Sequence, residues 1–121
     1  MIPILPIITP WDQAATLDRL GGDEELLAEL AQIFAHESPQ QMEKLRDAVS
    51  REDADAIMRG AHTIKGEVSC LGAVLAASTA QELERMGRDK RLDGAAQTFL
   101  TLERELQVFS RLLLAAVATH P

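Results

Sequence analysis

Residues 53–71 read DADAIMRGAHTIKGEVSCL, and they carry the clearest helical pattern in the chain. Its apolar positions are spaced 4, 3, 4 and 3 residues apart, which puts them on one face of an α-helix. Asp53 stands where an N-cap side chain belongs, and Gly72 marks a break after the last apolar position. The stretch therefore predicts an amphipathic helix that buries one side. The buried positions are Ile57, Ala61, Ile64, Val68 and Leu71.

The segment before it carries the same helical pattern over a greater length. Asp23 is placed to cap it, and Glu24 and Glu25 suit the positive end of the helix dipole. Pro39 interrupts the run, and the surrounding Ser38-Pro39-Gln40-Gln41 resembles a capping box, which would start a second helix. Because the apolar stripe keeps its phase across the proline, we expect one long kinked helix. The stripe comprises Leu27, Leu30, Phe34, Met42, Leu45 and Val49.

Three further helices are predicted around these two. Thr9-Pro10-Trp11-Asp12 is typical of a helix start with proline at the first position, and Gly21-Gly22 ends that short helix after Leu20. A fourth helix is predicted to stop near Gly87, and Asp93 is predicted to start a fifth. The fourth would bury Val74, Leu75, Leu83 and Met86. The fifth would bury Phe99, Leu102, Leu106, Phe109 and Leu113.

These elements predict an all-α protein, an antiparallel up-down four-helix bundle with a short extra N-terminal helix. The chain has 121 residues, enough for one domain. We expect residues 1–8 to be a lead-in, 9–118 the bundle domain and 119–121 a tail. The lead-in, MIPILPII, lacks the positive region of a signal peptide, and no segment approaches the roughly 20 apolar residues that span a bilayer.

Composition excludes several functions. The net charge is −7, with no Tyr, one Trp and three Phe, which argues against nucleic-acid binding. Cys70 is the only cysteine, so an intrachain disulfide and a multi-cysteine zinc site are excluded, and a reducing cytoplasmic location is expected. We predict neither a metal site nor a membrane partner.

One candidate functional site stands out on the central helix. On a helical wheel, His62 lies about 140° from the centre of the apolar stripe, Lys65 about 80° and Gly66 about 180°. His62 should therefore face solvent, with Lys65 three residues further on the same side. A mid-helix glycine costs up to ~1 kcal/mol relative to alanine, so Gly66 needs a reason, and clearance for an approaching molecule supplies one.

An exposed imidazole beside a cation can accept a phosphoryl group. Its neutral ring has a nucleophilic lone pair, and Lys65 can meet the added negative charge. The spacing fixes no carboxylate as a base, and no glycine-rich loop is present for a nucleotide, so donor and metal ion would come with a partner. A plain surface histidine explains the same residues about equally well at this point.

The sequence resembles the histidine-containing phosphotransfer (HPt) family of two-component phosphorelays at three places. The first two are Ala61-His62-Thr63-Ile64-Lys65-Gly66 and Leu71-Gly72-Ala73. The third is Leu20-Gly21-Gly22-Asp23-Glu24-Glu25-Leu26-Leu27, which is similar to the turn between the first two helices of that family. The resemblance extends over about residues 10–115 and agrees with the predicted helix order.

The resemblance implies a monomeric, cytoplasmic phosphoryl carrier without kinase activity. It would take phosphate from the aspartate of one response-regulator receiver domain, pass it to another, and serve a hybrid sensor histidine kinase. His62 would carry the phosphoryl group, Lys65 would neutralise it, and Gly66 would give the receiver room. The chain would need no cofactor, because Mg²⁺ and the acidic pocket belong to the receiver.

The resemblance also implies an apolar docking patch around the histidine. Met58, Arg59 and Ser69 flank His62 and are our candidates, with Arg88 as a possible second basic contact. Three residues depart from the family pattern: Glu67 and Val68, where small residues are usual, and Gly60, where a larger aliphatic is usual. We expect Val68 to alter packing, Glu67 to touch a neighbouring helix, and Gly60 to loosen the central helix.

Alternatives to a phosphoryl carrier are a pure binding module for a receiver or kinase, and a small enzyme using His62 as acid or base. The enzyme lacks a recognisable second catalytic group. Three other reactive side chains are predicted bystanders: His36 on the solvent face, His120 in the tail and the Cys70 thiol. Residues 112–118 are predicted to pack as the end of the fifth helix, with dimerisation as the alternative.

Overall fold

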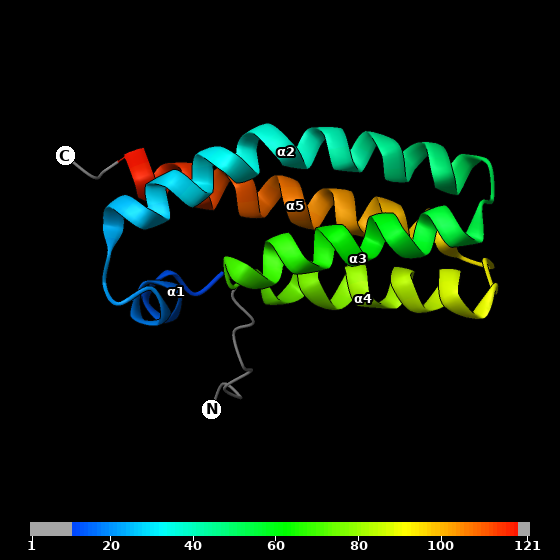
Figure 1. Ribbon diagram of the computed structural model, residues 1–121, viewed down its shortest axis with the longest axis horizontal. Helices are drawn as coiled ribbons and strands as arrows, with labels where there is room; N and C mark the ends of the chain where they lie inside the picture. The colour runs from blue at the N-terminus through cyan, green and yellow to red at the C-terminus, as the bar shows by residue number, and fades with distance from the viewer. Residues whose placement is uncertain (1–10, 119–121) are drawn as a thin grey trace, which may run out of the picture.

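A computed structural model describes residues 11–118, and it is helical throughout with short connections (Figure 1). Within that range it contains five helices and no strand. The predicted lead-in 1–8, the predicted tail 119–121 and His120 lie outside the described residues. The helices are α1 (Gln13–Arg19), α2 (Glu24–Ser50), α3 (Ala54–Cys70), α4 (Val74–Asp89) and α5 (Ala95–Ala118).

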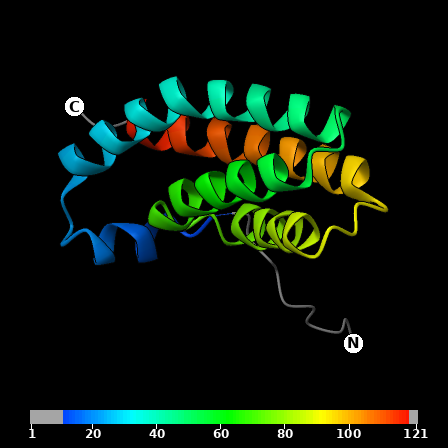
Figure 2. The same cartoon turned by 45° about the vertical axis from the view of Figure 1, so that its right-hand side comes forward.

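The four long helices form the predicted antiparallel up-down bundle. α3 packs against α2 and α4, and α5 packs against the same two helices, so each helix has two main neighbours. Figures 1 and 2 show α2 and α5 along one side and α3 and α4 along the other. The short α1 lies at the end of the bundle where α2 begins and α3 ends (Figure 1). None of the described helices is long and apolar enough to cross a membrane.

The core confirms the apolar stripes predicted for α3 and α5. All ten predicted positions on these two helices are buried, none more than 5% exposed. Phe109 of α5 makes edge-to-face contacts with Phe34 and Trp11, at centroid separations of 5.3 and 5.6 Å. The Trp11 indole also donates a hydrogen bond to the Leu71 carbonyl at 2.6 Å, and this bond ties the start of α1 to the end of α3.

The observed helix starts confirm two of the predicted N-caps and correct the third. Asp23 and Asp53 cap α2 and α3 as predicted, each accepting a backbone N–H three residues ahead. For α1 the predicted start at Pro10 is wrong, because Trp11 is not helical and Asp12 caps the helix by accepting from the Ala15 N–H at 3.0 Å. Thr9 and Pro10 themselves lie outside the described residues.

α2 runs as a single helix across Pro39, as its unbroken stripe predicted. Ser38 is therefore inside the helix and is buried, instead of capping a second one. The stripe side chains Leu27, Phe34 and Leu45 are buried, and the other three are partly buried against the core. One long helix thus spans the full length of α3.

The stripe predicted for α4 is wrong at its start. Val74 is 68% exposed, and the helix continues past Gly87 to Asp89, with Lys90 in the left-handed conformation at its end. The core face of α4 consists mostly of small residues, which carry little hydrophobic signal in the sequence. Its buried residues are Ala76, Ala80, Leu83, Glu84 and Gly87.

Two glycines set how closely α3 approaches its neighbours. At Gly87 an added Cβ would lie 2.6 Å from the Ala54 carbonyl oxygen and 2.7 Å from the Met58 nitrogen, so α4 touches the α3 backbone there. At Gly60 an added Cβ would lie 3.2 Å from Leu45 Cδ1 of α2. Gly60 therefore also allows close packing against α2, and the expectation that it loosens α3 stays a prediction.

Candidate functional site

His62 projects from the solvent face of α3, opposite the buried stripe. Its side chain is 67% exposed, while Ala61 and Ile64 on either side of it along the helix are fully buried. The predicted orientation of the imidazole is thereby confirmed. Another molecule can reach this ring without any rearrangement of the core.

The inner nitrogen of the ring contacts a buried carboxylate that the sequence analysis did not identify. His62 Nδ1 lies 3.1 Å from Oε2 of Glu84, a residue of α4 that is only 5% exposed. The hairpin between α3 and α4 turns at Gly72, ten residues after His62 and twelve before Glu84. Antiparallel helices place residues at such matched distances from the turn at the same level. Counting residues in both directions from the turn at Gly72 would have identified Glu84 as a neighbour of His62.

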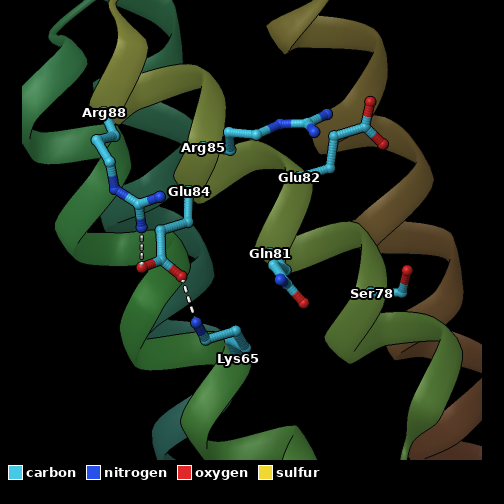
Figure 3. Close-up of a pocket in the computed structure, with 7 residues that line it drawn as sticks. All are labelled: Lys65, Ser78, Gln81, Glu82, Glu84, Arg85 and Arg88. Carbon is cyan, nitrogen blue, oxygen red and sulfur yellow. Dashed lines mark hydrogen bonds and ion pairs between the residues drawn. The ribbon is translucent and has the colours of Figure 1, made fainter.

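Two cations also converge on the Glu84 carboxylate. Lys65 Nζ lies 2.6 Å from Oε1, and one Arg88 guanidinium nitrogen donates to Oε2 at 3.0 Å. Figure 3 shows the carboxylate between these two side chains, one from each helix of the hairpin. Glu84 thus links His62, Lys65 and Arg88 into one network at the surface of α3 and α4.

The network keeps Glu84 ionised despite its burial. The hydrogen bond from Lys65 lowers the pKa of the Glu84 carboxyl below its ordinary value of 4.5, and the contact with His62 lowers it further. Burial acts in the opposite direction but is outweighed. A carboxylate at neutral pH can only accept hydrogen bonds.

This ionisation state assigns the two nitrogens of the imidazole. Because Glu84 only accepts, the proton of the neutral ring belongs on Nδ1, where it is donated to Oε2. The lone pair then lies on Nε2, the nitrogen on the far side of the ring from Glu84. The arrangement is that of an oriented nucleophile with its reactive atom toward solvent.

Of the other predicted site residues, Met58, Arg59, Gly66 and Ser69 lie on α3 with His62, and Arg88 lies on α4. Gly66 is exposed, and a Cβ built there would meet no other side chain of residues 11–118 within 4 Å, which leaves open space at this point of α3. Arg59 and Ser69 are exposed, and Ser69 lines a groove with Lys65 between α3, α4 and α1. Met58 is half-buried, and its backbone packs against Gly87.

The remaining candidates lie where the sequence analysis expected them. His36 is exposed on α2, Cys70 is exposed, and Val68 is buried in the core. Glu67 faces α2, where it lines a groove with Glu37. Within residues 11–118, no three His, Cys, Asp or Glu side chains are grouped so that they would hold a metal ion.

The fold and the site together define a helical bundle that presents one oriented histidine to other molecules. The chain belongs to the Hpt domain family, whose model matches residues 29–112. It is therefore a histidine phosphotransfer protein of two-component phosphorelays, a carrier and not a kinase, and such proteins partner with receiver domains.

A solved structure supports the same assignment. The fold is similar to the crystal structure of histidine-containing phosphotransfer protein B (HptB) from Pseudomonas aeruginosa PAO1, with a TM-score of 0.86 and 26% sequence identity. The match covers 94% of this chain and 99% of that one. No curated protein sequence matches the chain.

Proposed function

We propose that His62 Nε2 is the atom that carries the phosphoryl group. The observation that supports this assignment most is the pairing of an exposed ring with a buried, ionised Glu84 on its other nitrogen. Gly66 leaves the approach to the ring open. His36, the other histidine among the described residues, has no carboxylate partner and contacts only the Gln40 amide, at 3.5 Å.

The transfer step follows from the proton on Nδ1. The Nε2 lone pair attacks phosphorus in the aspartyl phosphate of the receiver, the N–P bond forms, and the P–O bond to the aspartate carboxylate breaks. No proton leaves Nδ1 in this step, so the phosphorylated ring carries a positive charge. The Glu84 carboxylate at 3.1 Å stabilises that charge, and the reverse step transfers phosphate to the next receiver.

Lys65 has two roles in this proposal. In the free protein its ammonium is paired with Glu84 and maintains the carboxylate as an anion. When phosphate arrives on the ring, the same ammonium lies on the side of α3 from which it can neutralise the phosphate oxygens. Arg88 contacts Glu84 as well, so the carboxylate keeps a cationic partner if Lys65 turns toward the phosphate.

The partner supplies what this chain does not. We place Mg²⁺ and the acidic pocket in the receiver domain, and a hybrid sensor histidine kinase upstream. We assign the partner-binding surface to Met58, Arg59, Ser69 and Arg88 around His62. A monomeric state, a cytoplasmic location and a bundle domain over residues 9–118 complete the proposal, all from the sequence analysis.

Phosphorylation by a phosphorylated receiver domain tests the assignment of His62. We expect an acid-labile, base-stable phosphoryl group, which His62→Gln abolishes while the circular dichroism spectrum stays helical. His36→Gln is the matched control and should be phosphorylated at the wild-type rate. If the wild-type protein binds the phosphorylated receiver but takes up no phosphate, it is a pure binding module. If the His62→Gln variant still becomes phosphorylated, His62 is excluded as the carrier.

A further inference from the structure

An apolar groove lies beside the proposed transfer site, between α2 and α3. It has a volume of about 290 Å³ and is lined mostly by aliphatic and aromatic carbon. Gly66 forms part of its wall, one helical turn after His62, so this edge of the groove lies near the reactive ring. Ile33 on its rim is 58% exposed, a large apolar side chain in contact with water. Its apolar lining residues include Leu30, Ile33, Phe34 and Leu71.

Two carboxylates interrupt this apolar lining, Glu67 from α3 and Glu37 from α2. Glu67 Oε2 is buried, and no hydrogen-bond donor among residues 11–118 reaches it. No lysine or arginine of the described residues lines the groove. Burial raises the pKa of the Glu67 carboxyl, and the charge of Glu37 raises it further. The free protein therefore holds a poorly solvated acceptor next to a like charge.

The chemistry of the groove restricts what can occupy it. A purely apolar occupant would remove the remaining water from Glu67 and give it no donor, which costs free energy. An anionic occupant would add a third negative charge. An occupant with a lysine or arginine next to an aliphatic side chain satisfies both features, because the cation pairs with the carboxylates and the aliphatic group covers Ile33.

We propose that the Glu37–Glu67 groove is the specificity-determining part of the docking surface, and that it selects receiver domains presenting a lysine or arginine beside an aliphatic side chain. This inference rests on the proposed function, since the occupant is the phosphate donor or acceptor of His62. The groove lies on the α2 side of His62, whereas Lys65, Glu84 and Arg88 lie on the α4 side. The selective groove and the transfer chemistry thus lie on different faces of the same helix.

Two phosphoryl donors separate these two faces. Phosphoramidate is small enough to reach His62 without touching the groove, whereas a phosphorylated receiver domain must dock. We expect Glu67→Gln to lower kcat/KM for the receiver about tenfold, mainly through KM, and Glu67→Lys about a hundredfold. Both variants should react with phosphoramidate at the wild-type rate. Glu43→Gln, an exposed charge change elsewhere on α2, should alter neither rate by more than about twofold.

The receiver side provides the complementary measurement. The partner for this test is the receiver domain from the same genome that exchanges phosphate fastest with the wild-type protein. Replacing the lysine or arginine of that receiver that pairs with Glu67 by glutamate should restore phosphoryl transfer to the Glu67→Lys variant. Wild-type receiver kinetics in Glu67→Gln would overturn this inference and leave the proposed function intact. If phosphoramidate fails to phosphorylate His62 in the wild-type protein, the proposed function itself is wrong.

Discussion

Two glutamates lie on either side of His62, and their surroundings are opposite. Glu84, on the α4 side, is buried and pairs with the Lys65 and Arg88 cations and the His62 ring, and its pKa is lowered. Glu67, on the α2 side, has a buried oxygen that no hydrogen-bond donor of residues 11–118 reaches, and its pKa is raised. The comparison separates a carboxylate whose partners are already in place from one that, in our proposal, obtains its partner from a docked protein.

Removing the Glu84 carboxylate should have the largest effect on phosphoryl transfer. Glu84→Ala leaves the His62 ring without orientation and the phosphorylated ring without a counter-charge, so we expect phosphoryl uptake from phosphoramidate to fall about a hundredfold. The cations it frees are partly exposed, so the loss of stability should be only about 1–2 kcal/mol. Glu82→Ala, an exposed carboxylate two residues earlier, is the control and should keep the wild-type rate. Rapid uptake by Glu84→Ala would remove Glu84 from the mechanism.

Removing Lys65 should have a smaller effect because Arg88 still pairs with Glu84. We expect Lys65→Ala to slow transfer from both donors about tenfold, with a change in unfolding free energy below about 1 kcal/mol. Lys44→Ala, at an exposed position on α2, controls for the loss of one positive charge. An unchanged rate would show that neither the phosphate nor Glu84 depends on the Lys65 ammonium.

Neutralising Glu67 should change the stability of the fold. Because its carboxylate is poorly solvated and lies near Glu37, Glu67→Gln should raise the free energy of unfolding at pH 7 by about 1 kcal/mol. Thermal unfolding at pH 7 measures this gain, with Glu43→Gln as the control. A variant less stable than the wild type would mean that Glu67 has a favourable partner in the free protein.

The smallest expected effect is on the pH dependence of stability, to which the Glu67 and Glu84 carboxyls should contribute in opposite ways. The folded-state pKa of Glu67 lies above 4.5, so its unfavourable contribution is present at pH 7 and disappears as the pH falls through that pKa toward 4.5. The folded-state pKa of Glu84 lies below 4.5, so its favourable contribution is full above pH 4.5 and is lost only below it.

Denaturant titrations across this range measure both contributions. The stability gain of Glu67→Gln over wild type should vanish by about pH 4.5, whereas the deficit of Glu84→Gln should persist to that pH and shrink below it. Parallel pH profiles for the two variants would contradict the opposite pKa shifts.

The sequence predicted the parts of the fold whose buried positions are large and apolar. The stripes of α3 and α5, the continuity of α2 across Pro39 and the exposure of His62 all follow from periodicity, and the structure confirms them. α4 was predicted less well because three of its five buried residues are alanine or glycine, whereas Val74, the apolar residue at its start, faces solvent.

The candidate site was predictable within one helix but not between helices. His62, Lys65 and Gly66 lie within one turn and a half of α3, so a helical wheel relates them directly. Glu84 is 22 residues away, and its contact with His62 depends on the register of the α3–α4 hairpin. Spacing within one helix carries no information on that register, so the carboxylate partner of the imidazole could not be predicted from it.

The close contact at Gly87 links the geometry of the bundle to the chemistry at its surface. Gly87 follows Glu84 by one turn, and its lack of a side chain is what allows α4 to touch the α3 backbone at Ala54 and Met58. Any larger residue there would act as a wedge between the hairpin helices and lengthen the reach from Glu84 to the imidazole. Gly87 therefore affects the orientation of the His62 ring, although it contacts neither the phosphate nor the partner.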